Sequence, residues 1–405
     1  MDLMLVLFFI SLFTVTAGAI VKPIQNIFLT QPLLAMVAGI LLGPEVLDII
    51  HATSGKERDH ILELACKFTI AMALMSTALR IPGNFFRKNY ISQSVIVLIG
   101  MILMWFSASG LLYWVFTGFS FAECLLFGAI ITPTDPVVAS TIVSGDNAKK
   151  FLPASVRHTI SFESGSNDGL AYPIVFYAIF LVQGSEFPLQ KWVSHTVLYE
   201  TVLSAVIALV VGHLAGVVMH RAHKAGYMTE KALLSFSLGL AFLLLAGLET
   251  LHMNGIIGVF IGGLGFSRHL EKNEDLKEEK VQESMERIFT IPVFFLFGVF
   301  IPWQEWSALG WSAVWIVLLI LFLRRIPAFL ILKPFLPQFR GKWKEMLIVG
   351  WFGPIGVAAL FYAILAKEKT GLEAAWAIPA LLVFASTIVH GFTSLPLEKL
   401  YYKKK

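Results

Sequence analysis

Carboxylates interrupt two otherwise apolar stretches of the chain, at Asp135, Glu163 and Asp168. An ionised side chain near the centre of a bilayer costs at least about 2.5–3.5 kcal/mol, so each such residue marks a candidate functional site. Carboxylate, hydroxyl and carbonyl oxygens are the ligands that hard cations such as Na⁺ prefer. A desolvated carboxylate can hold a proton instead, because burial disfavours its charged form. A site that takes either a cation or a proton, but not both, has the chemistry needed to exchange one for the other.

Polar residues gather around two of these carboxylates. On a helix, Ser164 and Asp168 are four residues apart and share a face, and Glu163 and Asn167 share the adjoining face. The two carboxylates therefore point in different directions, so that one can bind an ion while the other pairs with a cation. Asp168, Ser164 and carbonyl oxygens around Thr134 together supply an oxygen set suited to Na⁺.

A buried carboxylate needs a positive partner, and the chain offers Arg324 and Arg325 in another apolar stretch. Long arginine side chains near the end of a span can also reach the lipid headgroups. We expect one of these arginines to reach the headgroups and the other to pair with Glu163. The spacing by itself leaves open which arginine does which.

Ionisable residues elsewhere in the apolar stretches have simpler interpretations. Lys67 follows Glu63 by four residues, a favourable spacing for a pair on one helix. Glu123, Glu200 and Glu249 lie toward the outer ends of their stretches and are interpreted as cavity or interface residues. We interpret His390 as a hydrogen-bonded contact between helices rather than as a proton relay.

Two apolar stretches contain residues that break a helix. Pro133 and Pro136 flank Asp135, and each proline removes a backbone donor and releases a carbonyl. Three glycines and a proline within 350–356 can unwind a second stretch in the same way. Irregular backbone inside a membrane is tolerated only within protein or beside water, and matched interruptions in two halves indicate a transport site near the midplane.

The composition identifies the environment in which these residues act. Of the 405 residues, 57% are hydrophobic and only 14% are charged, whereas a soluble globular protein has about 25% charged residues. This balance excludes an ordinary soluble enzyme, and we find no hydrolase or protease motif, so we do not expect an enzyme. The two cysteines lie in apolar runs and form neither a disulfide framework nor a metal-ligand pattern. No basic, aromatic patch indicates a nucleic-acid partner.

The apolar stretches predict an all-α polytopic membrane protein. A spanning helix needs about 20 mostly apolar residues, and by this rule the chain has about thirteen candidate spans. They cover residues 2–21, 27–43, 59–80, 91–117, 121–144, 155–182, 192–219, 230–248, 254–267, 286–303, 310–334, 345–366 and 374–393.

The positive charges predict the orientation. Most of the 31 lysines and arginines fall on alternate loops, as expected when cytoplasmic loops carry the excess. This places the N-terminus outside and the C-terminus in the cytoplasm of a cell membrane (inner or plasma membrane). The charged segment 268–287 is expected to be a cytoplasmic helical linker, and 394–405 a short cytoplasmic tail.

The two breaks predict an internal symmetry. We expect residues 1–393 to form one transporter unit with inverted repeats over about 1–182 and 230–393, joined by a linker helix at 192–219. Spans within 91–182 and 310–393 would form the core, where two discontinuous helices cross. The remaining spans would form a scaffold.

The broken stretches resemble the monovalent cation:proton antiporters, in the electroneutral branch that contains the NhaP-type and Na⁺/H⁺ exchanger proteins. The resemblance covers nearly the whole chain and is sharpest in Thr134-Asp135-Pro136 and in the run from Glu163 to Gly169. Arg325 and the glycine-rich break support it. The run from Phe352 to Gly356 resembles the fungal plasma-membrane antiporters.

The resemblance implies roles for particular residues. It implies Asp168 as carrier of the ion and the proton, and Asp135 as a charge that offsets helix dipoles. It also implies transported Na⁺ and H⁺ with no other cofactor, and a homodimer in the bilayer. The remaining implied assignments are Asn167 as neighbour of the carrier, Ser164 and the Thr134 carbonyl as Na⁺ ligands beside Asp168, and Glu163 with Arg325 as a structural ion pair.

Two departures from the family pattern bear on ion preference. NhaP-type proteins usually carry a glutamate in the third span, where this chain has Ser76. Many relatives carry Gly-Leu-Arg-Gly in the twelfth span, where this chain has Gly353-Pro354-Ile355-Gly356. The choice among Na⁺, Li⁺ and K⁺ therefore stays open.

The sequence thus predicts a secondary antiporter that exchanges a monovalent cation for H⁺ by alternating access, with Na⁺ as the first candidate. A single carrier carboxylate predicts exchange of one cation for one proton, which is electroneutral. A sodium-coupled solute symporter of related fold is the alternative. Such a symporter would need a pocket of donors for its solute, whereas these stretches offer mainly acceptors. Proton-coupled flux without solute separates the two classes.

Overall fold

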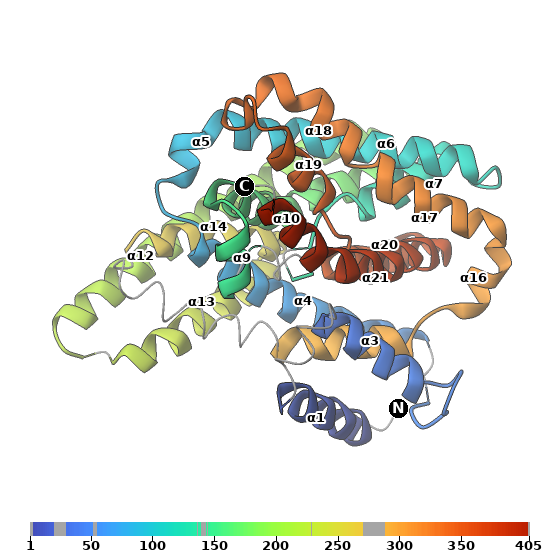
Figure 1. The fold of residues 1–405 in the computed structure, drawn as a ribbon, viewed down its shortest axis with the longest axis horizontal. Coiled ribbons are helices and arrows are strands. Elements are labelled where there is room, and N and C mark those ends of the chain that lie inside the picture. The colour runs from blue at the N-terminus through green and yellow to red at the C-terminus, as the bar shows by residue number, and fades with distance from the viewer. Residues whose placement is uncertain are drawn as a thin grey trace.

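The computed structural model describes residues 3–19, 30–51, 55–135, 137–138, 143, 145–227, 229–269 and 288–403. Within these ranges every regular element is a helix (Figure 1). Beyond His269, the segment expected to be a cytoplasmic linker lies outside the described residues.

The first half of the chain contains helices wherever apolar spans are expected. Residues 85–115 form one continuous helical segment with a π-helical turn, η1, in its middle. The elements are α1 (Leu3–Ala19), α3 (Gln31–Leu42), α4 (Gly55–Arg80), α5 (Phe85–Ser94), η1 (Val95–Gly100), α6 (Met101–Val115), α7 (Phe121–Ile130), α9 (Gly145–Phe151) and α10 (Ala154–Val182).

The second half follows the same pattern. A long segment, 188–224, begins the half and contains a second π-helix, η2. The elements are α11 (Pro188–Lys191), η2 (Trp192–Leu203), α12 (Ser204–Lys224), α13 (Glu230–Thr250), α14 (Gly255–Ser267), a helix at Ile288–Val299, α16 (Trp303–Leu309), α17 (Trp311–Leu323), α18 (Ile326–Leu332), the 3₁₀ turns η3 (Lys333–Phe335) and η4 (Pro337–Phe339), α19 (Trp343–Trp351), α20 (Val357–Thr370) and α21 (Ala374–Lys403).

Several of these helices are long and apolar enough to cross a membrane. Five helices in the described ranges meet both criteria, and a sixth span results if the bent pair Ile288–Val299 and Trp303–Leu309 counts as one. Shorter apolar helices, among them α1, α3, α7 and α14, occupy other expected spans. The protein is therefore a multi-pass membrane protein made of helices.

α13 and α14 are separate helices, as the expected spans 230–248 and 254–267 have them, and the chain turns sharply between them at His252, whose φ is 55°. The structure differs from the expectation at the C-terminal end. α21 continues to Lys403, so the described part of the expected tail, 394–403, belongs to the last helix.

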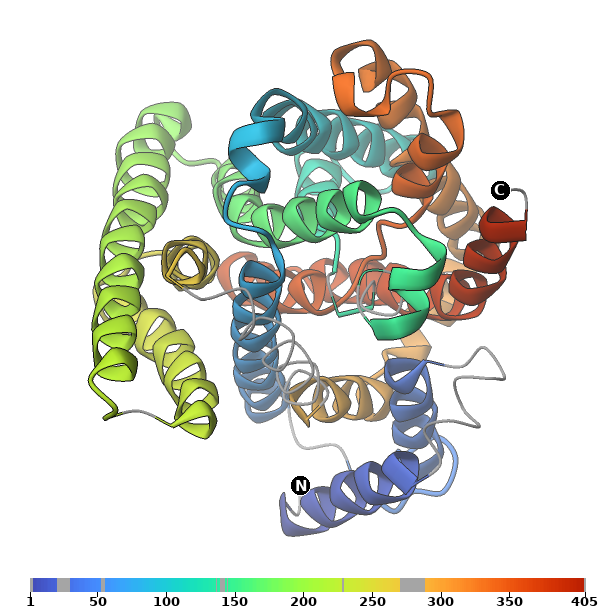
Figure 2. The ribbon, with the colours of Figure 1, turned by 60° about the vertical axis from the view of Figure 1, so that its left-hand side comes forward.

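α14 lies between two groups of helices, with α12 and α13 on one side and α4 and α10 on the other (Figure 2). Glycines allow this close packing. A Cβ atom at Gly169 of α10 would lie 2.7 Å from Cα of Ile257, and one at Gly165 would overlap the Phe260 ring. The polar face of α10 is thereby held deep inside the protein.

Candidate functional site

The first helix break lies directly after α7. The helix ends at Ile130, and residues 131–135 are not helical, as the flanking prolines predict. The backbone N–H of Thr132 donates to the Ala129 carbonyl (3.2 Å), and its hydroxyl donates to the Gly128 carbonyl (2.8 Å). These local hydrogen bonds thus satisfy some of the backbone carbonyls at the end of the broken helix.

The second break separates α19 from α20. α19 ends at Trp351, and regular helix resumes only at Val357. The Ile355 N–H donates to the Ser386 hydroxyl (2.8 Å), and His390 Nε2 lies 3.1 Å from the Trp351 carbonyl. The predicted interruptions of both stretches are therefore confirmed, and His390 makes the helix contact expected of it.

The two breaks contact each other through Asp135. Its backbone N–H donates to the Pro354 carbonyl (2.8 Å). One carboxylate oxygen accepts from the N–H groups of Val137 (2.6 Å) and Val138 (3.3 Å), and the other accepts from the N–H of Val357, at the start of α20. The negative side chain therefore lies at the positive N-terminal end of α20, where it is stabilised by the helix dipole.

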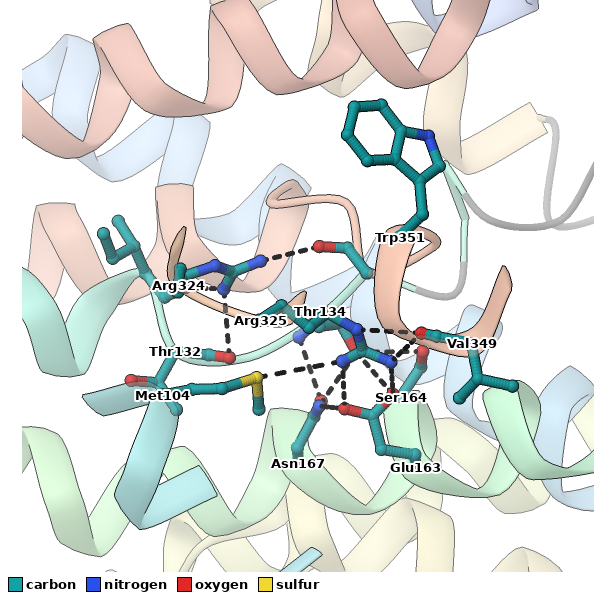
Figure 3. Close-up of polar contacts among 12 residues, drawn as sticks. Met104, Thr132, Thr134, Glu163, Ser164, Asn167, Arg324, Arg325, Val349 and Trp351 are labelled. Atoms are coloured by element: carbon teal, nitrogen blue, oxygen red, sulfur yellow. Dashed lines mark hydrogen bonds and ion pairs between the residues drawn. The ribbon is translucent and has the colours of Figure 1, made fainter. Parts of the chain in front are cut away.

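Arg324 provides the opposite charge at the same place. It is only 3% exposed. Its guanidinium donates to the carbonyls of Ile131, Thr132 (3.3 Å) and Gly353 (2.6 Å), just beyond the C-terminal ends of α7 and α19 (Figure 3). Such ends carry partial negative charge and lack backbone donors. The expectation that one of the two arginines reaches the headgroups is wrong, because the carbonyls of both broken helices need a donor and Arg324 supplies it.

Glu163 and Arg325 lie against each other in the interior. Two guanidinium nitrogens donate to the two carboxylate oxygens, at 2.6 and 3.0 Å, and both residues are almost fully buried. Arg325 also donates to the Val349 carbonyl of α19 at 3.1 and 2.9 Å. The bidentate geometry leaves neither charge without a partner.

A hydrogen-bonded network joins the first break to α10 (Figure 3). The Asn167 amide donates to the Thr134 hydroxyl (2.8 Å) and to Glu163 (2.9 Å), and its oxygen accepts from the Thr134 N–H (3.1 Å). The Thr134 hydroxyl donates to Glu163 (3.1 Å) and lies 3.1 Å from the Ser164 hydroxyl. Four of the site residues expected from sequence are thus brought together.

Asp168 lies one helical turn beyond Ser164, and its surroundings differ. The residue is 2% exposed, yet its Oδ1 has no hydrogen-bond partner among the described residues. Asp135 and Glu163 are both close enough to act on it electrostatically. A desolvated carboxylate oxygen without a donor is suited to accept a proton or to bind a cation.

Glycines of the second break provide space for these charges. A Cβ atom at Gly353 would overlap the Arg325 side chain, and one at Gly356 would overlap the Asp135 carboxylate. The run Gly353-Pro354-Ile355-Gly356 has no arginine of its own, and Arg324 reaches its Gly353 carbonyl from another part of the chain. Ser76, which stands where relatives carry a glutamate, is buried and its hydroxyl has no partner among the described residues.

Two residues near Asp168 were missed from sequence. The Tyr362 hydroxyl donates to the Asp168 carbonyl (2.6 Å). Asn254, the N-cap of α14, donates to the Gly169 carbonyl (2.9 Å), which lacks its helical partner because Pro173 has no N–H. The proline was a usable signal for a donor near Gly169, but nothing in the sequence indicates which residue supplies it.

Residues 8–399 match the family described as the sodium/hydrogen exchanger, transmembrane. The chain is 30% identical to a Na⁺/H⁺ antiporter of Schizosaccharomyces pombe over 397 residues, which cover 91% of this chain and 84% of that protein. It is 28% identical to a Na⁺/H⁺ antiporter of Saccharomyces cerevisiae, covering 91% of this chain but only 40% of that longer protein.

The fold is similar to a solved structure. The sodium proton antiporter MjNhaP1 from Methanocaldococcus jannaschii superposes with a TM-score of 0.73, covering 98% of this chain and 99% of that chain at 20% identity. The all-helical membrane architecture is therefore NhaP1-like.

Proposed function

The chain belongs to the sodium/hydrogen exchanger family, and we propose that it exchanges a monovalent cation, Na⁺ in the first instance, for H⁺ across the membrane. The family is one of transporters rather than enzymes. Na⁺/H⁺ antiport by relatives over nearly the whole of this chain supports the proposal.

The carboxylate of Asp168 is the observation that carries the proposal. Of the three carboxylates around the breaks, Glu163 is neutralised by Arg325, and Asp135 is held by backbone N–H groups. Of these three, only Asp168 keeps a buried oxygen without a hydrogen-bond partner among the described residues. Asp168 is therefore the carboxylate among the three that is best suited to bind Na⁺ or H⁺.

Competition for this group couples the two fluxes. A bare carboxylate is costly in a dry region, so the carrier crosses with Na⁺ or with H⁺ but resists crossing empty. Ser164 and the Thr134 carbonyl complete the ligand set for Na⁺, and water supplies the remaining positions. Asn167 orients Thr134 without adding a charge.

The same arrangement favours electroneutral exchange. One carboxylate accepts one Na⁺ or one H⁺, and the adjacent Glu163–Arg325 pair keeps both its charges throughout the cycle. Apparent Na⁺ affinity should therefore weaken as pH falls, because protons compete for Asp168, while the maximal rate changes less.

The proposed cycle moves a core against a scaffold. The core comprises the spans within 91–182 and 310–393, and about thirteen spans in inverted repeats complete the unit. We place the N-terminus outside, the C-terminus in the cytoplasm, and a homodimer contact in the scaffold.

Proteoliposomes loaded with a pH-sensitive dye test the function. Wild-type protein should dissipate a pH gradient on addition of Na⁺, with Li⁺ and K⁺ tested in turn, and a K⁺/valinomycin voltage clamp should leave the rate unchanged. Asp168→Asn keeps the side-chain shape and should abolish exchange in folded protein. Wild-type rates in Asp168→Asn would refute the carrier assignment, and a rate that follows the imposed voltage would refute one-for-one exchange.

A further inference from the structure

A further buried carboxylate lies away from the breaks, on η2. Glu200 is 7% exposed, and its Oε2 has no hydrogen-bond partner among the described residues. Its backbone carbonyl accepts from the Asn254 N–H (2.8 Å), so the residue is held firmly in place. A buried intramembrane carboxylate of this kind is a functional hypothesis by default.

A second oxygen without a partner lies on the same helix. Thr196 is fully buried, and its Oγ1 also lacks a hydrogen-bond partner among the described residues. Thr196 precedes Glu200 by four residues, and both belong to the buried face of η2, most of whose other residues are exposed or half-buried. π-Helical segments are rare in proteins, and those that occur are often found at functional sites.

Two tyrosines connect this place to Asp168. Tyr172 lies one turn beyond Asp168 on α10, and its hydroxyl interacts with the Glu200 carboxylate. Tyr362 interacts with Tyr172 and donates to the Asp168 carbonyl. Glu200 therefore lies toward the C-terminal end of α10 relative to Asp168. The pattern of positive charges places that end of α10 at the outer side of the membrane.

The surrounding charges favour a cation. Lys67 is shared between Glu63 (3.0 Å) and Glu249 (3.2 Å), so one positive charge faces two carboxylates. Glu249 also acts electrostatically on Tyr172, beside Glu200. His195 Nε2 lies 3.5 Å from Glu200 Oε1, and this histidine is charged only when protonated.

We propose that Glu200 and Thr196, with the Tyr172 hydroxyl, form a second binding site for a monovalent cation between the outer surface and Asp168. The oxygen ligands are of the type that Na⁺ prefers, and the site would concentrate the ion before it reaches the carrier. This inference rests on the proposed function only for the identity of the ion.

Equilibrium binding of radioactive Na⁺ to the purified full chain at alkaline pH tests the site. Asp168→Asn should keep saturable Na⁺ binding at about half the stoichiometry of wild type, because one of the two sites remains. The double variant Asp168→Asn/Glu200→Gln tests this remaining site. Glu200→Gln should weaken this remaining binding by about tenfold or more, as expected when a charged ligand becomes neutral. Glu249→Gln is the matched control, because it removes a nearby carboxylate that already has Lys67 as partner, and should have a smaller effect.

Thr196→Val, which preserves shape and keeps the charge of Glu200, should weaken the same binding several-fold and guards against misfolding of Glu200→Gln. The inference is overturned if Asp168→Asn binds no Na⁺, or if its remaining binding is unaffected by Glu200→Gln. Exchange by wild-type protein is measured in a separate assay. A failure of antiport would therefore not change the interpretation of the Na⁺-binding result.

Discussion

The two helix breaks are supported by different side chains. The first break, after α7, is held by charged and amide side chains of α10, through Asn167 and the Glu163 network. The second break, after α19, is held by neutral groups of α21, Ser386 and His390. Asp135 and Arg324 contact both breaks.

The difference indicates a division of labour. The side chains that support the first break lie on the same helix as Asp168, so the geometry of that break bears directly on the proposed carrier. The second break supplies backbone and space, since Gly353 and Gly356 accommodate Arg325 and Asp135. Substitutions in the shared charges should therefore affect both breaks, whereas substitutions in α21 should affect the second break alone.

The largest effect is expected at the buried ion pair. Glu163→Ala leaves Arg325 without its carboxylate and should cost about 3–5 kcal/mol of stability. Thermal melting in detergent, followed by size-exclusion fluorescence, measures this loss. Normal amounts of stable protein with changed ion selectivity alone would show that the pair is an ion ligand rather than a support.

Removal of the shared arginine should come next. Arg324→Met keeps a long side chain but leaves carbonyls of both breaks without a charged donor, and should cost about 1.5–3 kcal/mol. The same melting assay applies, with Arg324→Lys as a variant that keeps the charge and recovers part of the loss. If Arg324→Met melts like wild type, the carbonyl contacts do not stabilise the breaks.

Asp135→Asn should have a smaller effect, because one oxygen still accepts from Val137 while the amide nitrogen now faces the Val357 N–H. A loss of about 1–2 kcal/mol is expected from that one buried donor. Exchange in proteoliposomes should fall without disappearing, in contrast to Asp168→Asn. Complete loss of exchange in well-folded Asp135→Asn would assign Asp135 to the carrier rather than to the helix ends.

The smallest effect is expected in α21. Ser386→Ala removes one neutral hydrogen bond to the Ile355 N–H and should cost about 1 kcal/mol. The Na⁺ dependence of exchange should remain close to wild type, because the first break is untouched. A large shift in apparent Na⁺ affinity would show that the two breaks are not as separate as their supports suggest.

Much of the fold follows from the sequence, because apolar length and proline or glycine position are local properties. Several apolar membrane helices, the two interruptions and the crowded polar face of α10 could be predicted in this way. The role of Arg324 could not, because a long side chain near the end of a span fits either the headgroups or the interior. The choice between headgroups and interior depends on where the carbonyls at the two helix breaks lie, and only the tertiary structure shows this.

The sequence by itself determined that this chain is a polytopic helical membrane protein, and that Asp135, Glu163 and Asp168 need partners inside it. The chemistry of burying charge in lipid requires that much without any knowledge of the fold. Only the tertiary structure decided which partner each carboxylate receives. Contacts such as Arg325–Glu163 and Val357–Asp135 join residues far apart in the chain, so their pairing depends on how the helices pack. Among the described residues, that packing leaves Asp168 as the carboxylate beside the breaks that has an oxygen without a hydrogen-bond partner.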